Sequence, residues 1–289
     1  MSEPLIKIAG LHKSYKKHAA LKGLELTVAA GEVLAFLGPN GAGKTTTINI
    51  LTGLLQPDAG EVYYDGVLFN PENLPQKRVM GVVPQHNNLD RDLTVTRNLK
   101  VHGLLFGLRG KALTARINTV LEQVGMRELA RRPAGQLSGG QKRRLVIARA
   151  LLHDPKILFL DEPSTGLDVE ARRALHQIIA GLNAKAGVSV FLTTHYIEEA
   201  DLLADRVAFI DAGRVVAVGT PAELKAAIGA YALEYLADNA FKALYFNSRD
   251  EAVAAAARQA GEVRIREVTL EDVYLKLTGR KLEDGRSPV

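Results

Sequence analysis

The sequence has 289 residues, of which 47% are hydrophobic and 24% charged, and 37 Lys and Arg against 32 Asp and Glu give a net charge of +5. It contains no cysteine, which excludes disulfide bonds and any metal site or nucleophile built on a thiolate. No apolar stretch approaches the roughly 18 residues of a membrane-spanning helix and no secretory signal is visible, so we expect a globular chain that cannot by itself carry a solute through a membrane.

The chain begins with two short apolar segments. Residues 5–9 and 24–28 alternate or cluster apolar side chains as strands do, and we expect the polar residues 13–18 to form a turn between them. Tyr15 lies in that turn. A tyrosine there could stack on an adenine ring, or it could simply pack on the sheet.

A glycine-rich loop follows the apolar run 33–37 and precedes a helix-like stretch at 46–54. Its pattern, G-x-x-x-x-G-K-T, suits a phosphate-binding loop, because glycines with positive φ bring backbone N–H groups close to an anion at a helix N-terminus. Lys44 would reach the β- and γ-phosphates of a nucleotide, and the Thr45 hydroxyl would coordinate Mg²⁺. The alternative is a turn that binds nothing. The predicted loop comprises Gly38, Pro39, Asn40, Gly41, Ala42, Gly43, Lys44, Thr45 and Thr46.

Strand patterns at 60–64 and 81–84 give way to helical periodicity between about residues 93 and 151. A helical insertion therefore interrupts an α/β lobe. We expect the apolar side chains of Leu104, Leu105 and Phe106 to belong to its core, although they could instead contact a partner. The arginine pairs at 131–132 and 143–144 are expected to lie on solvated faces, although they could instead contact lipid headgroups.

The α/β pattern resumes with the continuous apolar runs 157–160 and 188–192, separated by a helix over 169–182. Such runs are typical of central parallel strands covered on both faces. Beyond residue 221 a strand at 231–236, a helix at 250–259, a strand at 262–266 and a helix at 270–277 predict a small β/α unit. Residues 281–289 are predicted to form a polar, disordered tail.

Two acids end the strand at 157–160. Asp161 is placed to hold Mg²⁺ through its water shell, and Glu162 to orient and polarise an attacking water. Paired acids at a strand end can also be solvated turn residues. Beside a phosphate loop we favour the catalytic interpretation.

The sequence LSGGQ precedes a helix over 142–151 and predicts a second anion site at that helix N-terminus. Ser138, Gly139, Gly140 and Gln141 resemble the signature motif of ABC (ATP-binding cassette) ATPases. In that family, ATP lies between the phosphate loop of one subunit and the signature of another. The resemblance therefore implies ATP and Mg²⁺ as ligands and a second copy of the chain as a partner. The alternative is a helix merely capped by serine.

The same resemblance gives roles to further residues. Gln85 is similar to the Q-loop glutamine, which senses Mg²⁺ and the attacking water, and Asp168 to the last residue of the D-loop. His195 resembles the switch histidine that contacts the γ-phosphate. Tyr15 matches the adenine-stacking aromatic. The implied catalytic set is Glu162, His195, Gln85 and Lys44, and the implied metal set is Thr45, Gln85 and Asp161.

The implied fold is a P-loop NTPase, with a RecA-like parallel sheet, an antiparallel β subdomain and an inserted helical subdomain. We expect an ATPase domain at 1–220, with helices inserted at about 86–155, and a C-terminal extension at 221–289. Residues 82–90 and 270–280 resemble ATPase subunits of type 2 exporters. This implies ATP-driven export through a separate integral-membrane permease, with the chain held peripherally at the cytoplasmic face of the membrane.

Three other functions compete with this interpretation. A soluble ABC ATPase that acts on ribosomes or DNA usually carries two cassettes or a long coiled coil, and neither is visible here. A module that nucleotide only regulates predicts a damaged catalytic acid, whereas Glu162 is present. A small-molecule kinase leaves LSGGQ unexplained. The basic excess is modest and no dense basic run with interleaved aromatics occurs, so we expect no nucleic-acid partner.

Overall fold

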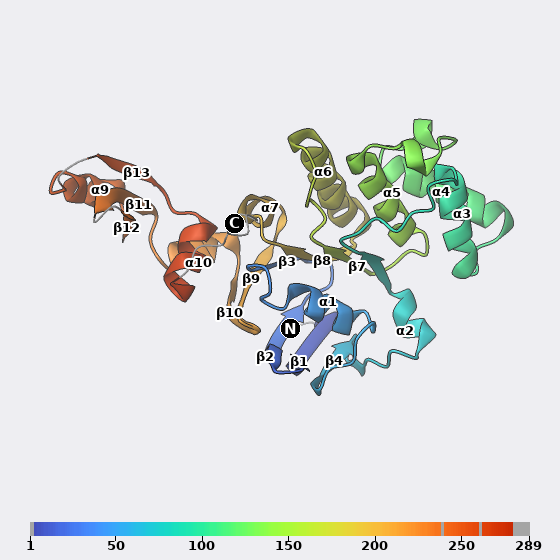
Figure 1. The fold of residues 1–289 in the computed structure, drawn as a ribbon, viewed down its shortest axis with the longest axis horizontal. Helices are drawn as coiled ribbons and strands as arrows, with labels where there is room; N and C mark the ends of the chain where they lie inside the picture. The colour runs from blue at the N-terminus through green and yellow to red at the C-terminus, as the bar shows by residue number, and fades with distance from the viewer. Residues whose placement is uncertain (1–2, 238–239, 260–261, 280–289) are drawn as a thin grey trace.

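The computed structural model describes residues 3–237, 240–259 and 262–279. Within them, the central sheet has six strands in the order β10-β9-β3-β8-β7-β6 (Figure 1). Strands β6 to β9 and β3 run parallel, and β10 runs antiparallel to β9. Every residue of β3, β7 and β8 is buried, which confirms the prediction of parallel strands covered on both faces. The bounds are β3 Val33–Leu37, β6 Met80–Val83, β7 Ile157–Asp161, β8 Ser189–Thr194, β9 Arg206–Asp211 and β10 Arg214–Gly219.

In the described part of the chain, a second sheet of four antiparallel strands has the order β2-β1-β4-β5, with β1 Ile6–Tyr15, β2 His18–Val28, β4 Ala59–Tyr64 and β5 Val67–Leu68. The turn predicted at 13–18 is present but shorter, because β1 and β2 pair along a long hairpin and leave only Lys16 and Lys17 to link them. Shifts of register along this pair break the strict alternation that reveals a strand. Helix α1, Lys44–Leu51, begins two residues before its predicted start and packs into the hydrophobic cluster that joins the two sheets.

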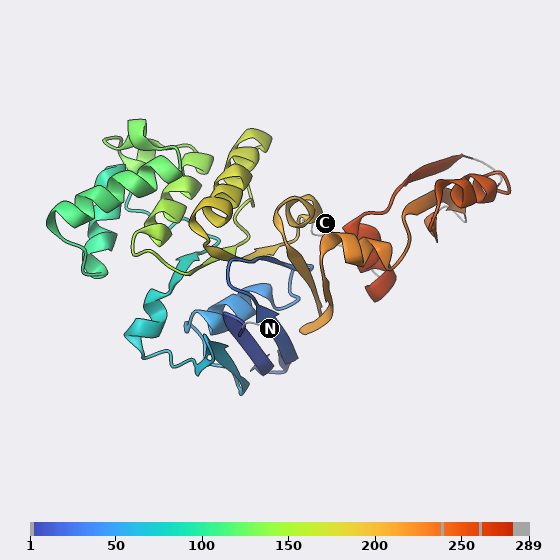
Figure 2. The ribbon, with the colours of Figure 1, turned by 180° about the vertical axis from the view of Figure 1, so that it is seen from behind.

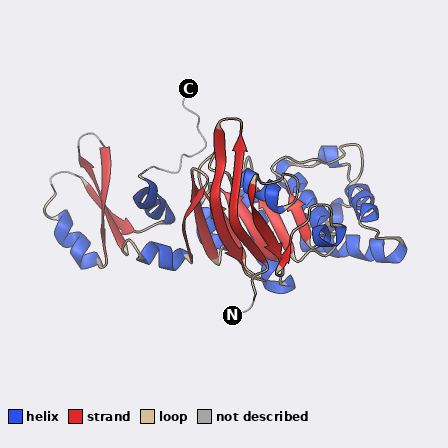
Figure 3. Ribbon diagram, turned by 90° about the horizontal axis from the view of Figure 1, so that it is seen from below, coloured by secondary structure: helices blue, strands red, loops and turns tan. Residues whose placement is uncertain are grey.

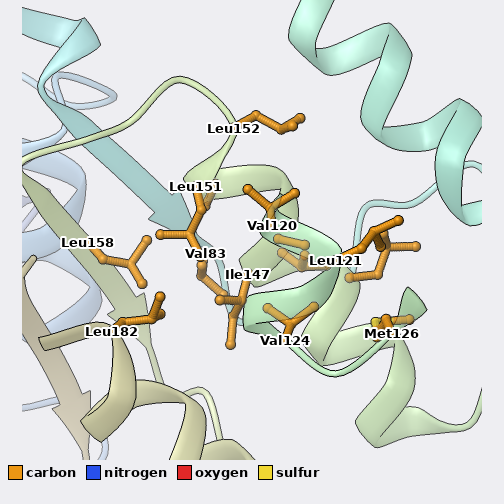
Figure 4. Close-up of a cluster of buried hydrophobic side chains, with 14 of the residues drawn as sticks. Val83, Val120, Leu121, Val124, Met126, Ile147, Leu151, Leu152, Leu158 and Leu182 are labelled. Carbon is orange, nitrogen blue, oxygen red and sulfur yellow. The ribbon is translucent and has the colours of Figure 1, made fainter. Parts of the chain in front are cut away.

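The predicted helical insertion is present and packs on one face of the central sheet (Figures 1 and 2). Figure 4 shows Val120, Ile147 and Leu158 of β7 in the one hydrophobic cluster that unites helices and sheet. Leu104 and Leu105 are 46% and 77% exposed, so the expectation of core packing is wrong for both, because the buried stripe of α3 runs through other positions. The elements are α2 Leu74–Arg78, α3 Val95–Leu105, α4 Gly110–Gln123, η1 Arg127–Leu129, η2 Ala134–Gln136 and α5 Gly139–Leu151.

The remaining elements lie in the C-terminal half of the chain. In chain order they are α6 (Val169–Ala186), α7 (Ile197–Leu203), α8 (Pro221–Ala226), β11 (Tyr231–Ala237), β12 (Ala240–Phe246), α9 (Arg249–Ala256), β13 (Val263–Glu267) and α10 (Leu270–Thr278). Strands β12-β11-β13 form a small antiparallel sheet within the described residues, and it stands apart from the central sheet (Figure 3). Strand β12 was not predicted. The predicted tail, 281–289, lies outside the described residues.

Helix α10 returns from this extension to the main body. Its Val273 and Tyr274 pack in a cluster with Leu37 of β3 and Phe209 of β9. The Tyr274 hydroxyl donates a hydrogen bond to Asp211 at 3.1 Å. The capping pattern predicted at the start of this helix is confirmed, since the Thr269 side chain accepts the backbone N–H of Asp272. Helix α10 therefore anchors the extension to β9 and to β3, the strand that leads into the glycine-rich loop.

Candidate functional site

The loops that leave β3, β6, β7 and β8 meet at one edge of the central sheet, where α/β proteins commonly bind their ligands. They enclose a cavity of about 540 Å³. The predicted residues that line it are Tyr15, Asn40, Gly41, Gly43, Lys44, Thr45, Thr46, Gln85, Glu162 and His195. The fold thus brings together side chains that lie up to 180 residues apart, since Tyr15 and His195 line the same space.

The glycines of the phosphate loop serve two different purposes. Gly41 and Gly43 have positive φ of 81° and 109°, as predicted, and Gly43 is the N-cap of α1. Gly38 does not have positive φ, and that part of the prediction is wrong. A Cβ at position 38 would lie 2.2 Å from the carbonyl oxygen of Ile210, so glycine is required there by the close approach of β9.

Lys44 extends back across its own loop. Its Nζ donates hydrogen bonds to the carbonyl oxygens of Gly38 at 2.7 Å and Pro39 at 3.1 Å, and it lies 3.1 Å from Oε1 of Glu162. Burial lowers the pKa of the Lys44 ammonium, and the charge of Glu162 only partly offsets this effect. The ammonium is therefore already desolvated, and Lys44 lines the cavity where an anion would be held.

Glu162 follows β7 with a φ of 42°, a conformation that is unfavourable for a residue with a side chain. Its N–H donates to the carbonyl and hydroxyl oxygens of Thr193 on β8, both at 3.1 Å, which holds this backbone in place. Oε2 accepts from Gln85 Nε2 at 3.4 Å and lies 3.4 Å from His195 Nδ1. Burial by itself raises the pKa of Glu162, but His195 and Lys44 together bring the pKa down to about 2. The carboxylate is therefore ionised at neutral pH.

Asp161 is buried beside Glu162 and offers oxygen ligands to a cation. Oδ1 accepts hydrogen bonds from the hydroxyls of Thr193 at 2.7 Å and Thr45 at 3.4 Å. No group of three or more His, Asp or Glu side chains that could by itself hold a metal ion is present among the residues that the structure describes. One carboxylate and one hydroxyl nevertheless fit Mg²⁺, which commonly uses few protein ligands and completes its shell with water and phosphate oxygens.

The LSGGQ residues lie elsewhere. Ser138 and Gln141 form a reciprocal capping box at the start of α5, with bonds of 3.2 and 3.1 Å. They line a separate hollow of about 290 Å³ together with Gly140 and Asp168, the N-cap of α6. A Cβ on Gly140 would lie 2.6 Å from the Cβ of Ala171, so the starts of α5 and α6 pack closely there. Gly139 precedes this contact, and a Cβ added there would meet no other atom within 4 Å.

Comparisons with known proteins agree with this geometry. Residues 21–165 match the family model described as ABC transporter. The Nod factor export ATP-binding protein I of Cupriavidus metallidurans is 39% identical over 302 residues, which cover 97% of this chain and 99% of that protein. The chain belongs to the ABC transporter ATP-binding family. It is an ABC ATPase that binds and hydrolyses ATP and energises transport through a membrane partner.

Other relatives of this ABC ATPase include the daunorubicin resistance ATP-binding protein DrrA3 of Streptomyces coeruleorubidus, 37% identical, with 96% of this chain and 97% of that protein covered. Among solved structures, cbiO1 from Clostridium perfringens, part of the transporter complex cbiONQ, has a TM-score of 0.72 at 29% identity, covering 77% of this chain and 91% of that one. The dimeric cassette MJ0796 bound to ADP and Pi has a TM-score of 0.66 at 31% identity, covering 74% and 98%. The predicted fold is confirmed.

Arg143 of this ABC ATPase also contradicts its prediction. Arg143 was expected on a solvated face, but it is 3% exposed. Its guanidinium donates to the carbonyl oxygens of Pro163 at 2.9 Å, Asp161 at 3.0 Å and Pro84. Burial lowers the pKa of Arg143 to about 10, although the charges of Asp161 and Glu199 act in the opposite direction. Arg143 thus links α5 to the backbone on both sides of Glu162 and to the segment before Gln85.

The sequence did contain a signal for this arrangement. Arg143 is three, four and seven residues from Val146, Ile147 and Ala150, which form the buried stripe of α5. A charged residue inside an apolar stripe needs hydrogen-bond partners within the protein, and for Arg143 these are backbone carbonyls.

Among the described helices of the ABC ATPase, none is both long and apolar enough to span a bilayer.

Proposed function

We propose that two copies of this chain bind two ATP molecules in composite sites, and that closing and reopening of this dimer drives export through a separate integral-membrane permease. A single observation carries the proposal. Lys44 and Glu162 line one cavity, whereas Ser138 and Asp168 line another hollow of the same chain. Each is half of a site, and a second copy supplies the other half. The dimeric relative with ADP and Pi supports this arrangement.

Within one copy, Tyr15 stacks on the adenine, and its 47% exposure at the cavity edge leaves a ring face free for this. The N–H groups of the phosphate loop and Lys44 hold the phosphates. When the ammonium turns to the phosphates, it withdraws attraction from Glu162, whose pKa then rises from about 2. Glu162 becomes a better acceptor for the proton of the attacking water, which His195 and Gln85 help to orient.

Thr45 and Asp161 would hold Mg²⁺, with Gln85 reaching the same region through its contact with Glu162. When bound, the ion neutralises the charge of the β- and γ-phosphates and so favours phosphoryl transfer. Thr193 supports this site, because its hydroxyl donates a hydrogen bond of 2.7 Å to Oδ1 of Asp161 and so fixes the orientation of that carboxylate.

In the other copy, the signature completes the site. The exposed N-terminus of α5, with Ser138, Gly139, Gly140 and Gln141, faces the γ-phosphate that the first copy holds. Asp168 of the D-loop adds a contact across the dimer. ATP therefore acts as part of the interface, and its hydrolysis removes the contact that keeps the dimer closed.

We assign the ATPase domain to residues 1–220, the inserted helical subdomain to 86–155 and the extension to 221–289. The exposed Leu104 and Leu105 of α3 lie on that subdomain and would contact the permease. Relatives named for Nod factor export and for daunorubicin resistance support export as the direction. The chain would then sit peripherally at the cytoplasmic face of the membrane.

Steady-state ATP hydrolysis by the purified chain, measured over a protein concentration series with Mg²⁺, tests this proposal. We expect the activity per chain to rise with concentration until dimers predominate, and chelation of Mg²⁺ to abolish it. Activity per chain that stays constant from nanomolar to micromolar protein while the chain remains a monomer would contradict composite sites. It would favour ATP hydrolysis by a single copy instead.

A further inference from the structure

Glu199 is a buried acid that the mechanism above does not use. It lies on α7, four residues after His195, and is 1% exposed. Its Oε1 accepts a hydrogen bond from the hydroxyl of Ser164 and lies 3.1 Å from Nε2 of His176 on α6. Ser164 and His176 are themselves buried, at 0% and 9% exposure. Three polar side chains from three segments therefore meet away from solvent.

A polar cluster of this kind is not needed for stability alone. Buried ionic groups cost desolvation free energy, and well-packed apolar residues often replace them with no loss of stability. Here Oε2 of Glu199 has no hydrogen-bond partner among the described residues, so the cluster carries an uncompensated cost. The cluster instead provides a fixed geometry, because its hydrogen bonds hold Ser164, α6 and α7 in one mutual orientation.

A second contact joins the same two helices. The guanidinium carbon of Arg172 on α6 lies 4.4 Å from the ring centroid of Tyr196, and the Tyr196 ring lies 4.2 Å from that of His195. Residues 172 and 176 are one helical turn apart on one face of α6. Arg172 thus holds the residue beside His195, and His176 holds Glu199 one turn further along.

The D-loop leads directly into helix α6. Ser164 begins that loop, only two residues after Glu162, and Asp168 ends it as the N-cap of α6. The two contacts therefore tie the whole loop, through α6, to the segment that carries His195. A displacement of Asp168 by a partner copy would be transmitted to His195 as movement of one body.

We propose that Glu199 is a positioning residue that, with Ser164, His176 and the Arg172–Tyr196 contact, couples the D-loop to His195. This inference rests on the proposed function of His195 and Asp168. Glu199 contacts neither the cavity nor the phosphate loop, so it acts through the position of the imidazole. It should accordingly affect turnover and leave ATP binding unchanged.

The experiment is a double-mutant cycle of Glu199→Gln with His195→Ala, measuring kcat, the ATP dissociation constant and the thermal midpoint. We expect Glu199→Gln to lower kcat by about 10- to 100-fold with unchanged ATP affinity. In the His195→Ala background the same change should have less than about a twofold effect, because the group that it positions is gone. The exposed neighbour Glu198→Gln is the matched control and should retain full turnover.

Arg172→Met tests the second contact independently and covers the case in which Glu199→Gln fails to fold. It should lower kcat, while Arg173→Met, its exposed neighbour, should not. Losses that multiply in the cycle, or an Arg172 variant equal to its control, would overturn the inference. Failure of the proposed function is distinguishable, since Glu162→Gln would then retain wild-type turnover whatever Glu199 does.

Discussion

We expect Glu162→Gln to lower steady-state ATP turnover by about 10²- to 10⁴-fold, the usual effect of removing a general base. Glutamine keeps the shape of the side chain and can still contact His195 and Gln85, but it cannot accept a proton. It also removes the ion pair with Lys44 at 3.1 Å, which frees the ammonium for phosphate. ATP binding should therefore be retained or strengthened, and ATP should accumulate unhydrolysed in a dimer.

The measurement is ATP turnover together with size-exclusion chromatography in the presence of ATP. Glu128→Gln is the matched control, because Glu128 is exposed on the helical insertion and lines neither site. It should turn over ATP normally and form no long-lived dimer. Wild-type turnover by the Glu162 variant would show that hydrolysis uses another base.

We expect Ser138→Asp to lower turnover by about 100-fold, comparable to the loss of a main electrostatic contact in a transition state. Aspartate is as good an N-cap as serine, so the capping box and the fold of α5 should persist. Its negative charge, however, would face the γ-phosphate held by the other copy. ATP affinity of the isolated chain should be unchanged, because Ser138 does not line the cavity of Lys44.

Gln136→Asp controls for the added charge, since Gln136 is exposed two residues away. Equilibrium binding of ATP, ATP turnover and the thermal midpoint should be measured for both variants. Loss of turnover with an unchanged midpoint in the Ser138 variant alone supports a role across the dimer. Equal turnover in the two variants would exclude the signature from the reacting site.

Much of the site could be predicted because each residue follows a recognisable strand. Lys44, Glu162 and His195 come after continuous apolar runs, and parallel strands place their carboxyl ends at one edge. The local chemistry of a strand, a turn and a helix start therefore determined where these side chains would meet.

What could not be predicted depends on contacts between distant segments. Gly38 is required by Ile210 on a neighbouring strand, and the carbonyl oxygens that Arg143 binds lie just after β6 and at the end of β7. Neither partner is visible from local sequence. Strand β12 was not predicted for a related reason. Its sequence shows no clear alternation of apolar and polar residues, and it forms a strand because it pairs with β11.

The most direct test of a site shared between two chains is a cross-link from the phosphate loop of one copy to the signature of another. The natural chain has no cysteine, so Asn40→Cys in one preparation and Ser138→Cys in a second each introduce a single thiol. Both positions are exposed, and they line separate cavities of one chain. Both preparations carry Glu162→Gln so that ATP is retained, and each alone is a control.

Mixed in the presence of ATP and treated with a short bis-maleimide, the two preparations should yield a heterodimer that neither yields alone and that does not form without ATP. Absence of this product, or an equal yield without nucleotide, would contradict the composite site.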